Sequence, residues 1–186
     1  MVKKRVYLIH GWHGSSENAL FNWLSKELSK KGFEVKTLDM PNSSHPKIED
    51  WVGYLEEKIP FEEIDEDTYF IGHSIGCQTI MRFLEKLHKH KKIGGCVFIA
   101  GWFKLINLEP MELEIAHPWH DQEIDFGRVV DHCNNFLAIF SDNDTHVHLD
   151  EADKFKEKLD AKIVIKKNED HFENTEKIQE ILNFVK

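Results

Sequence analysis

Hydrophobic positions along the chain follow two alternating patterns. Short runs that are almost entirely apolar alternate with longer segments in which apolar residues return every three or four positions. The first pattern is typical of strands buried on both faces of a sheet, and the second is typical of amphipathic helices. The segments that predict strands are 5–10, 34–40, 68–72, 95–100, 135–140 and 161–166.

Helical spacing marks most of the segments between these strands. Leu20, Leu24 and Leu28 share one face of segment 17–31, and Gly32 follows that segment as a C-cap. Similar spacing predicts helices near 48–55, over 77–87, over 150–159 and close to the end of the chain. Asn174 is the expected N-cap of the final helix. The inward positions of that helix are Ile178, Ile181, Leu182 and Val185.

This alternation predicts a single domain over 1–186, built as a three-layer α/β/α sandwich around a mostly parallel sheet. Right-handed crossovers bring the carboxyl ends of the strands to one edge, where open α/β sheets bind ligands. Segment 101–132 does not fit the alternation, and it carries Trp102, Trp119 and Phe126 among several acidic residues. A long insertion after a strand is a candidate cap that lines a substrate pocket.

Composition excludes several classes of protein. Hydrophobic residues make up 41% of the chain and charged residues 31%, as in globular rather than disordered proteins. No apolar run approaches the ~20 residues that a membrane span needs. A formal net charge of −9 repels nucleic-acid phosphates and anionic lipids, and the basic stretch 86–92 is interpreted as the solvated end of a helix. We therefore expect neither a nucleic-acid partner nor a membrane span.

The N-terminus and the cysteines bear on location. Basic residues at 3–5 precede an apolar run, as in a secretion signal, but run 6–9 is far shorter than a signal core and no cleavage site follows it. Cys77, Cys96 and Cys133 lack zinc-ligand spacing and fit free thiols in a reducing compartment. The sequence predicts a cytoplasmic protein, and it leaves open whether the protein is a monomer or a dimer.

The strongest local signal is Gly72-His73-Ser74-Ile75-Gly76. It fits the G-x-S-x-G elbow, in which a nucleophilic serine sits on a strained turn between a strand and a helix. Side chains at either glycine position would collide with neighbouring backbone. The predicted strand before the motif and the predicted helix after it supply the required context. Ser74 is therefore the candidate nucleophile.

A serine hydroxyl needs a base and an orienting acid, which follow it in that fold in the order serine, acid, histidine. Asp142 and Asp144 both come directly after the predicted strand 135–140. Asp144 is favoured because Val147, three residues later, can return to the core, and Asp142 stays an alternative. His171 lies between the last strand and the last helix, which is the position expected of the base.

The loop after the first strand, His10-Gly11-Trp12-His13-Gly14, is the candidate oxyanion hole. A hydrolase aims two backbone N–H groups at the carbonyl oxygen of its substrate. We expect them to come from Ile75 and Trp12, and we expect His10 to hold the loop. A phosphate-binding interpretation of the same glycines is weak, because neither G-x-G-x-x-G nor G-K-[ST] is present.

Other histidines raise the question of a metal. His117 and His120 lie close in sequence, as do His146 and His148, but neither pair has the spacing of a hydrolytic zinc site. We expect no metal and no other cofactor. The predicted pocket residues are instead His73, Trp102 and Trp119.

With these residues in place, the chain resembles the α/β-hydrolase superfamily. More narrowly, it is similar to the compact serine hydrolase family typified by retinoblastoma-binding protein 9 and its bacterial relatives. The resemblance runs over nearly the whole chain, from the first strand and its H-G loop through the G-H-S-I-G elbow to the late aspartate and the last histidine.

The resemblance implies a sheet of about six strands and a triad of Ser74, Asp144 and His171. It implies hydrolysis of small esters or amides. One departure is His148, which stands where proline commonly follows the acid loop. The binding of a retinoblastoma pocket protein is not carried over, since the sequence contains no L-x-C-x-E string.

The favoured hypothesis is a serine hydrolase that cleaves small esters or related acyl compounds through an acyl-enzyme. The residues do not separate this reaction from thioester hydrolysis, peptide cleavage or acyl transfer to another acceptor. The alternative from another class is a non-catalytic interaction module that keeps the α/β-hydrolase fold.

Overall fold

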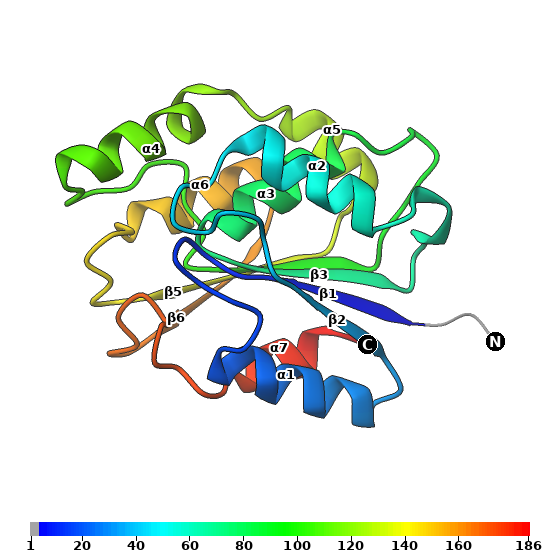
Figure 1. Ribbon diagram of the computed structural model, residues 1–186. Helices are drawn as coiled ribbons and strands as arrows, with labels where there is room; N and C mark the ends of the chain where they lie inside the picture. The colour runs from blue at the N-terminus through cyan, green and yellow to red at the C-terminus, as the bar shows by residue number, and fades with distance from the viewer. Residues whose placement is uncertain (1–3) are drawn as a thin grey trace.

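The computed structural model describes residues 4–186, so Lys3 of the basic N-terminus lies outside the described residues. Its centre is one sheet of six strands, all parallel, in the order β2-β1-β3-β4-β5-β6 (Figure 1). The predicted parallel sheet is confirmed. The strands are β1 Arg5–Ile9, β2 Glu34–Leu38, β3 Thr68–His73, β4 Gly95–Ile99, β5 Phe136–Ser141 and β6 Lys162–Lys166.

Helices cover both faces of the sheet and complete the three layers. Figure 1 shows α1 and α7 on one face and the other five helices on the opposite face. Each face has its own apolar core, because alternate side chains of a strand point to opposite sides. The helices are α1 Ala19–Lys30, α2 Ile48–Lys58, α3 Ile75–Leu84, α4 Pro110–Asp121, α5 Phe126–His132, α6 Asp150–Leu159 and α7 Gln179–Phe184, with a short 3-10 helix, η1 Phe61–Glu63.

The strand order brings distant loops together. β3 lies between β1 and β4, so the loop after β1 and the chain after β4 flank the end of β3 on its two sides. The reversal of strand order between β1 and β3 is the place where open α/β sheets bind ligands. β2 and β6 form the two edges of the sheet.

One helix prediction needs correction, and one segment without a helix prediction contains two helices. Segment 101–132 contains both α4 and α5. α4 includes Pro118 and buries only two of its residues, so it shows little of the apolar periodicity that predicts a helix. The final helix begins at Gln179, and its N-cap is Ile178 rather than Asn174.

The misplaced start of α7 has a local cause. The N–H of Phe172 donates to the carbonyl of Glu169, and the N–H of Thr175 donates to the carbonyl of Phe172. The Thr175 hydroxyl also donates to the Glu169 carboxylate at 2.6 Å. These bonds hold residues 169–175 in two consecutive turns, so no helix begins at Asn174.

Two further observations concern the cysteines and the character of the helices. Cys77, Cys96 and Cys133 are buried free thiols. None of the helices found within residues 4–186 has the length and apolar character required to cross a lipid bilayer.

Candidate active site

The turn at Ser74 is built by contacts that only glycines permit. A Cβ on Gly76 would lie 2.5 Å from the carbonyl oxygen of Ile9, at the end of β1. A Cβ on Gly72 would lie 2.8 Å from the backbone nitrogen of Cys77. The helix can therefore start directly against β1. Ser74 itself has φ 53° and ψ −121°, a sparsely populated conformation for a residue with a side chain.

The elbow is also tied to the neighbouring strand, since the N–H of Ser74 donates to the carbonyl of Ile99 in β4 at 2.8 Å. The Ser74 hydroxyl stands directly before α3, where the helix N-terminus contributes partial positive charge. The residue is 4% exposed. The predicted strand, strained turn and helix are all present.

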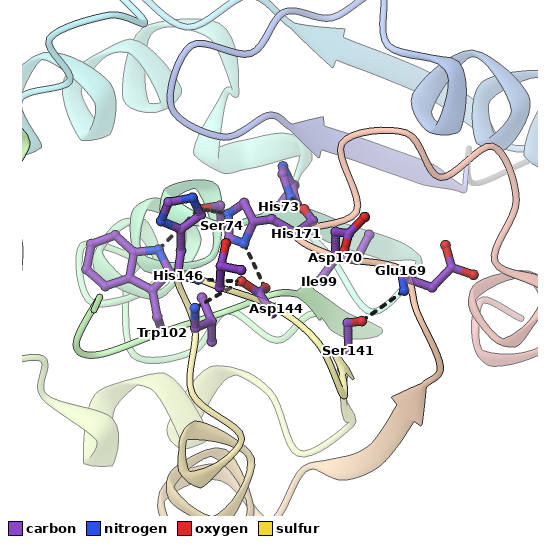
Figure 2. Close-up of polar contacts among 12 residues, drawn as sticks. His73, Ser74, Ile99, Trp102, Ser141, Asp144, His146, Glu169, Asp170 and His171 are labelled. Atoms are coloured by element: carbon purple, nitrogen blue, oxygen red, sulfur yellow. Dashed lines mark hydrogen bonds and ion pairs between the residues drawn. The ribbon is translucent and has the colours of Figure 1, made fainter. Parts of the chain in front are cut away.

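Ser74, His171 and Asp144 form one hydrogen-bonded series, although they lie far apart in the sequence. His171 Nε2 lies 2.9 Å from Ser74 Oγ, and His171 Nδ1 lies 2.8 Å from Asp144 Oδ2 (Figure 2). A carboxylate can only accept, so Nδ1 carries the ring proton and Nε2 is free to accept the serine proton. This arrangement places the serine hydroxyl against an imidazole nitrogen that can accept its proton.

Asp144 is held as a carboxylate. Burial raises the pKa of its carboxyl, but the hydrogen bond and charge of His171 and the backbone N–H groups of His146 and Val147 lower it more, so the net pKa is below its usual value. The two backbone donors bind Oδ1 at 2.9 and 3.0 Å. Asp142 has another partner, because its Oδ1 accepts the N–H of Asn168 at 2.9 Å. The geometry therefore favours Asp144 over the alternative Asp142.

Side chains join the loops after β5 and β6. The amide of Asn143 makes two bonds to Asp170: its Nδ2 donates to Oδ1 at 2.6 Å, and its Oδ1 accepts the backbone N–H at 2.9 Å. Next to them, the N–H of Glu169 donates to Ser141 Oγ at 3.0 Å (Figure 2). These bonds fix the loop that carries His171 against the loop that carries Asp144.

The loop after β1 lies beside the elbow, as expected for an oxyanion hole. Gly11 faces it closely, since a Cβ there would lie 3.1 Å from the Cβ of Ser74. The ring of His10 is buried, accepts the N–H of Met40 at Nε2 and donates from Nδ1 to the carbonyl of Gly11. Burial lowers the pKa of His10, which keeps the ring neutral. His10 holds the loop, as the sequence predicted.

Trp102, Trp119 and His73 lie in three different places around the site. The indole N–H of Trp102 donates to Ser74 Oγ at 3.2 Å (Figure 2), whereas that of Trp119 donates to the carbonyl of Pro46 at 3.1 Å. Trp119 nevertheless lines a pocket of about 420 Å³. His73 makes its contact with the backbone of His171, whose carbonyl lies 2.7 Å from Nε2. Its place in a substrate pocket stays a prediction, and its contacts give it a supporting role.

Burial lowers the pKa of His73 to about 3, and the nearby ring of His171 adds to the effect. His73 is therefore neutral at ordinary pH. It lines a hollow of about 200 Å³ together with the loop after β1, Phe172 and Glu173. A neutral ring at this position supports the loop of His171 without placing a second positive charge next to it.

His146 is a site residue that the sequence considered only as a metal ligand. Its ring centroid lies 5.7 Å from that of His171, and Figure 2 shows the two rings side by side. Its backbone also binds Asp144. Proximity to the favoured acid in the sequence could have identified it.

The histidine pairs considered as metal ligands have other partners. His117 lies 3.2 Å from Asp121, and His148 lies 3.0 Å from Asp150, both on the surface. Across the part of the chain that the structure describes, no cluster of three or more histidine, cysteine or acidic side chains could hold a metal ion.

The sequence of the chain is similar to those of known proteins. The family model described as "Serine hydrolase" matches residues 6–181. The "Putative hydrolase YdeN" of Bacillus subtilis is 31% identical, over 91% of this chain and 86% of its own length. The "Serine hydrolase RBBP9" of Rattus norvegicus is 24% identical, over 95% of this chain and 86% of its own length.

Solved structures agree on the fold. The crystal structure of the ydeN gene product from B. subtilis has a TM-score of 0.86 at 28% identity, covering 97% of this chain and 96% of that one. A structure from work on carboxylesterases of the thaumarchaeon Nitrososphaera gargenis has a TM-score of 0.69 at 17% identity, covering 98% and 88%, and shows the fold alone. The chain has the α/β-hydrolase fold and belongs to the serine hydrolase family.

Proposed function

We propose that this protein is a carboxylesterase-like enzyme that cleaves small esters through a covalent acyl intermediate on Ser74. The observation that carries the proposal is the unbroken series of hydrogen bonds from Ser74 Oγ through His171 to Asp144. Membership of the serine hydrolase family supports the general reaction. The choice of esters and the catalytic roles of the three residues belong to the proposal.

In the first half of the reaction, His171 Nε2 takes the Ser74 proton as Oγ attacks the carbonyl carbon. Asp144 accepts from Nδ1–H, keeps the ring in the required tautomer and stabilises the imidazolium that forms. The imidazolium then gives its proton to the leaving alcohol, and the acyl group remains on Oγ. In the second half, His171 activates a water molecule that releases the acid.

The negative charge on the carbonyl oxygen needs donors at the strand edge. The N–H groups of Ile75 and Trp12 are the proposed pair. Ile75 is the first residue of α3, so its N–H lies in the unpaired first turn of the helix. The Trp12 N–H has no hydrogen-bond partner among residues 4–186, whereas the N–H groups of His13 and Gly14 are both paired. Free donors of this kind suit an oxyanion, which forms only during the reaction.

Segment 101–132 is proposed to act as a small cap over this machinery, within a single domain. Its contribution at the nucleophile is Trp102, whose indole contacts Ser74 Oγ. The substrate is proposed to be a small molecule. A cytoplasmic location stays a prediction.

Covalent labelling tests the proposal directly. A fluorophosphonate probe should modify wild-type protein at Ser74, as located by peptide mass spectrometry, and p-nitrophenyl acetate should be hydrolysed. Ser74→Ala should lose both properties, and Ser29→Ala, a change on the exposed side of α1, should retain both. If folded wild-type protein shows neither labelling nor turnover, the enzyme proposal is wrong and the non-catalytic binding module is favoured.

A further inference from the structure

Trp102 occupies one side of the nucleophile. Its indole is fully buried, and its N–H donates to the same oxygen that faces His171. The Ser74 hydroxyl has only one proton to give, so it accepts from Trp102 while donating to His171. The indole thus orients the hydroxyl and fills the space beside it.

The indole is held in place by several contacts. The ring of His120 makes a T-shaped contact with it at a centroid distance of 5.4 Å, and His120 Nε2 in turn accepts the N–H of Leu105 at 3.1 Å. The carbonyl of Trp102 accepts from Gln78 Nε2 at 3.1 Å. This packing makes Trp102 a fixed wall of the site rather than a mobile side chain.

Gln78 is itself fixed by a buried cation. Gln78 Oε1 accepts from Arg82 Nη2 at 3.1 Å, and the same nitrogen donates to the carbonyl of Gln122 at 2.6 Å. Arg82 is buried, and its guanidinium lies 6.0 Å from the ring of Trp119. The nucleophile helix α3 and the end of α4 are therefore joined through the residues that position Trp102.

A pocket of about 420 Å³ lies behind this wall. Gln78 and His120, which contact Trp102, are also residues that line the pocket. Its other lining residues are of two kinds. Phe103, Trp119, Ile124 and Phe126 are apolar or aromatic, and Gln122, Glu123, Lys154 and Lys158 are polar or charged. A volume of this size holds a small organic group. Trp102 thus contacts the Ser74 hydroxyl on one side and, through Gln78 and His120, adjoins a pocket with an aromatic and apolar part.

The directions around the reacting carbon indicate which part of a substrate would enter this pocket. In the proposed reaction that carbon carries an oxyanion, a leaving group and an acyl chain. The oxyanion faces the loop after β1, and the leaving oxygen faces His171. The remaining direction is that of Trp102, which follows β4 on the opposite side of β3 from β1.

On the basis of the proposed function, we propose that Trp102 limits the length of the acyl group. With the indole in place, the enzyme accepts short acyl groups such as acetyl. Without it, the pocket behind becomes continuous with the site and receives a longer apolar chain. Burial of an additional methylene there should favour the reaction by about fourfold, provided that the chain reaches the pocket.

The test compares p-nitrophenyl acetate, butyrate, hexanoate and octanoate with the full-length protein. Wild-type kcat/KM should be highest for the shorter esters. Trp102→Ala should raise the hexanoate-to-acetate ratio of kcat/KM by about tenfold or more. Trp102→Phe keeps most of the wall but loses the N–H, so it should lower kcat by a few-fold at every chain length and leave the ratio unchanged.

A second substitution connects the gain to the pocket. Ile124→Trp adds bulk inside it. In the Trp102→Ala background it should cancel the gain for hexanoate. Trp102→Leu is the companion variant if Trp102→Ala does not fold, and it should give a smaller change in the same direction.

Three results would overturn the inference. One is a Trp102→Ala or Trp102→Leu enzyme that hydrolyses acetate but keeps the wild-type ratio. Another is a wild-type enzyme that already prefers hexanoate. The third is a gain that follows the length of the alcohol in a series of alkyl acetates. In each case Ser74 still reacts with the fluorophosphonate, whereas a failure of the proposed function shows no labelling of wild-type protein.

Discussion

The proposed nucleophile, Ser74, and the proposed base, His171, are held by different kinds of interaction. The position of Ser74 is set by steric exclusion. Gly72 and Gly76 bring the backbone of β1, β3 and α3 into direct contact, which leaves one path for the chain. The position of His171 is set by hydrogen bonds. Asn143, in the loop after β5, and Ser141, at the end of β5, bond to the loop that carries His171.

Because of this difference, substitutions in the two regions should affect the fold and the reaction differently. The elbow depends on residues adjacent in sequence and on the strands that they join, so a change there damages the fold as well as the reaction. The histidine loop depends on polar side chains from a different part of the chain, partly exposed to water. A change there should leave the fold intact and loosen the geometry of the base.

The largest expected effect is on the acid. Asp144→Asn removes the carboxylate that accepts from His171 Nδ1–H, and the new amide can donate to that nitrogen and favour the wrong tautomer. We expect kcat to fall by about 10⁴-fold with the fold retained. Steady-state kinetics on p-nitrophenyl acetate and circular dichroism give the two readouts.

Asp142→Asn is the matched control, since an amide oxygen can still accept the N–H of Asn168. It should keep activity within a few-fold of wild type. Equal losses in the two variants would contradict the assignment of Asp144.

The next effect concerns the elbow and stability. Gly76→Ala would place a Cβ 2.5 Å from the Ile9 carbonyl and 2.7 Å from that of His10, both backbone atoms. We expect the free energy of unfolding to fall by about 2–3 kcal/mol, with loss of activity. Urea denaturation of both proteins measures this difference.

Gly53→Ala is the control, because a Cβ there meets nothing within 4 Å in the middle of α2. That substitution should stabilise the protein by about 0.5–1 kcal/mol through helix propensity. A Gly76→Ala variant as stable as wild type would show that sterics do not fix the elbow.

A smaller effect is expected from His73, the neutral histidine whose ring contacts the backbone of His171. His73 has a pKa near 6.5 when unfolded and about 3 when folded. Between those values the unfolded chain binds more protons, so the free energy of unfolding decreases as the pH falls from 7 to 5. Buried His10, whose pKa is also lowered, contributes in the same direction.

His73→Gln keeps a hydrogen-bond donor but does not titrate. It should lessen the loss of stability between pH 7 and 5 by about 1–2 kcal/mol, as measured by urea denaturation at both values. His90→Gln, at an exposed position, should leave the loss as it is in wild type. If His73→Gln and wild type lose stability equally, His73 does not remain neutral in the folded protein.

The smallest effect is expected from the hydrogen bonds between the loop after β5 and the loop after β6. Asn143→Ala removes both bonds to Asp170, and we expect about a tenfold decrease in kcat with a stability loss of only about 1 kcal/mol. Kinetics and thermal unfolding of the variant, with exposed Asn22→Ala as control, measure the two quantities. A large loss of stability with normal kcat would show that the bonds serve the fold instead.

Local patterns explain what the sequence predicted well. Periodicity located all six strands, and two glycines around Ser74 identified the elbow, because both are consequences of short-range sterics. The choice between Asp142 and Asp144 was different. It depends on which carboxylate meets His171 after β5 and β6 have paired, so the local pattern at Val147 could favour Asp144 but left Asp142 as an alternative.

Other contacts could not be predicted for the same reason. The bond of Trp102 to Ser74 Oγ depends on the adjacency of β3 and β4. His73 follows the same strand as the nucleophile, and only the fold shows that it supports the backbone of His171. α4 was missed because Pro118 and its mostly exposed surface weaken the helical pattern.

Within residues 4–186, the open sheet leaves one backbone edge of β2 and one of β6 without a neighbouring strand. Exposed edges of this kind invite pairing between molecules, which leads to aggregation. Both edge strands are short, and both carry lysine: Lys36 in β2, and Lys162 and Lys166 in β6. A second molecule that added a strand to either edge would place its own backbone beside these charged side chains. The lysines of β2 and β6 should therefore disfavour strand pairing between molecules.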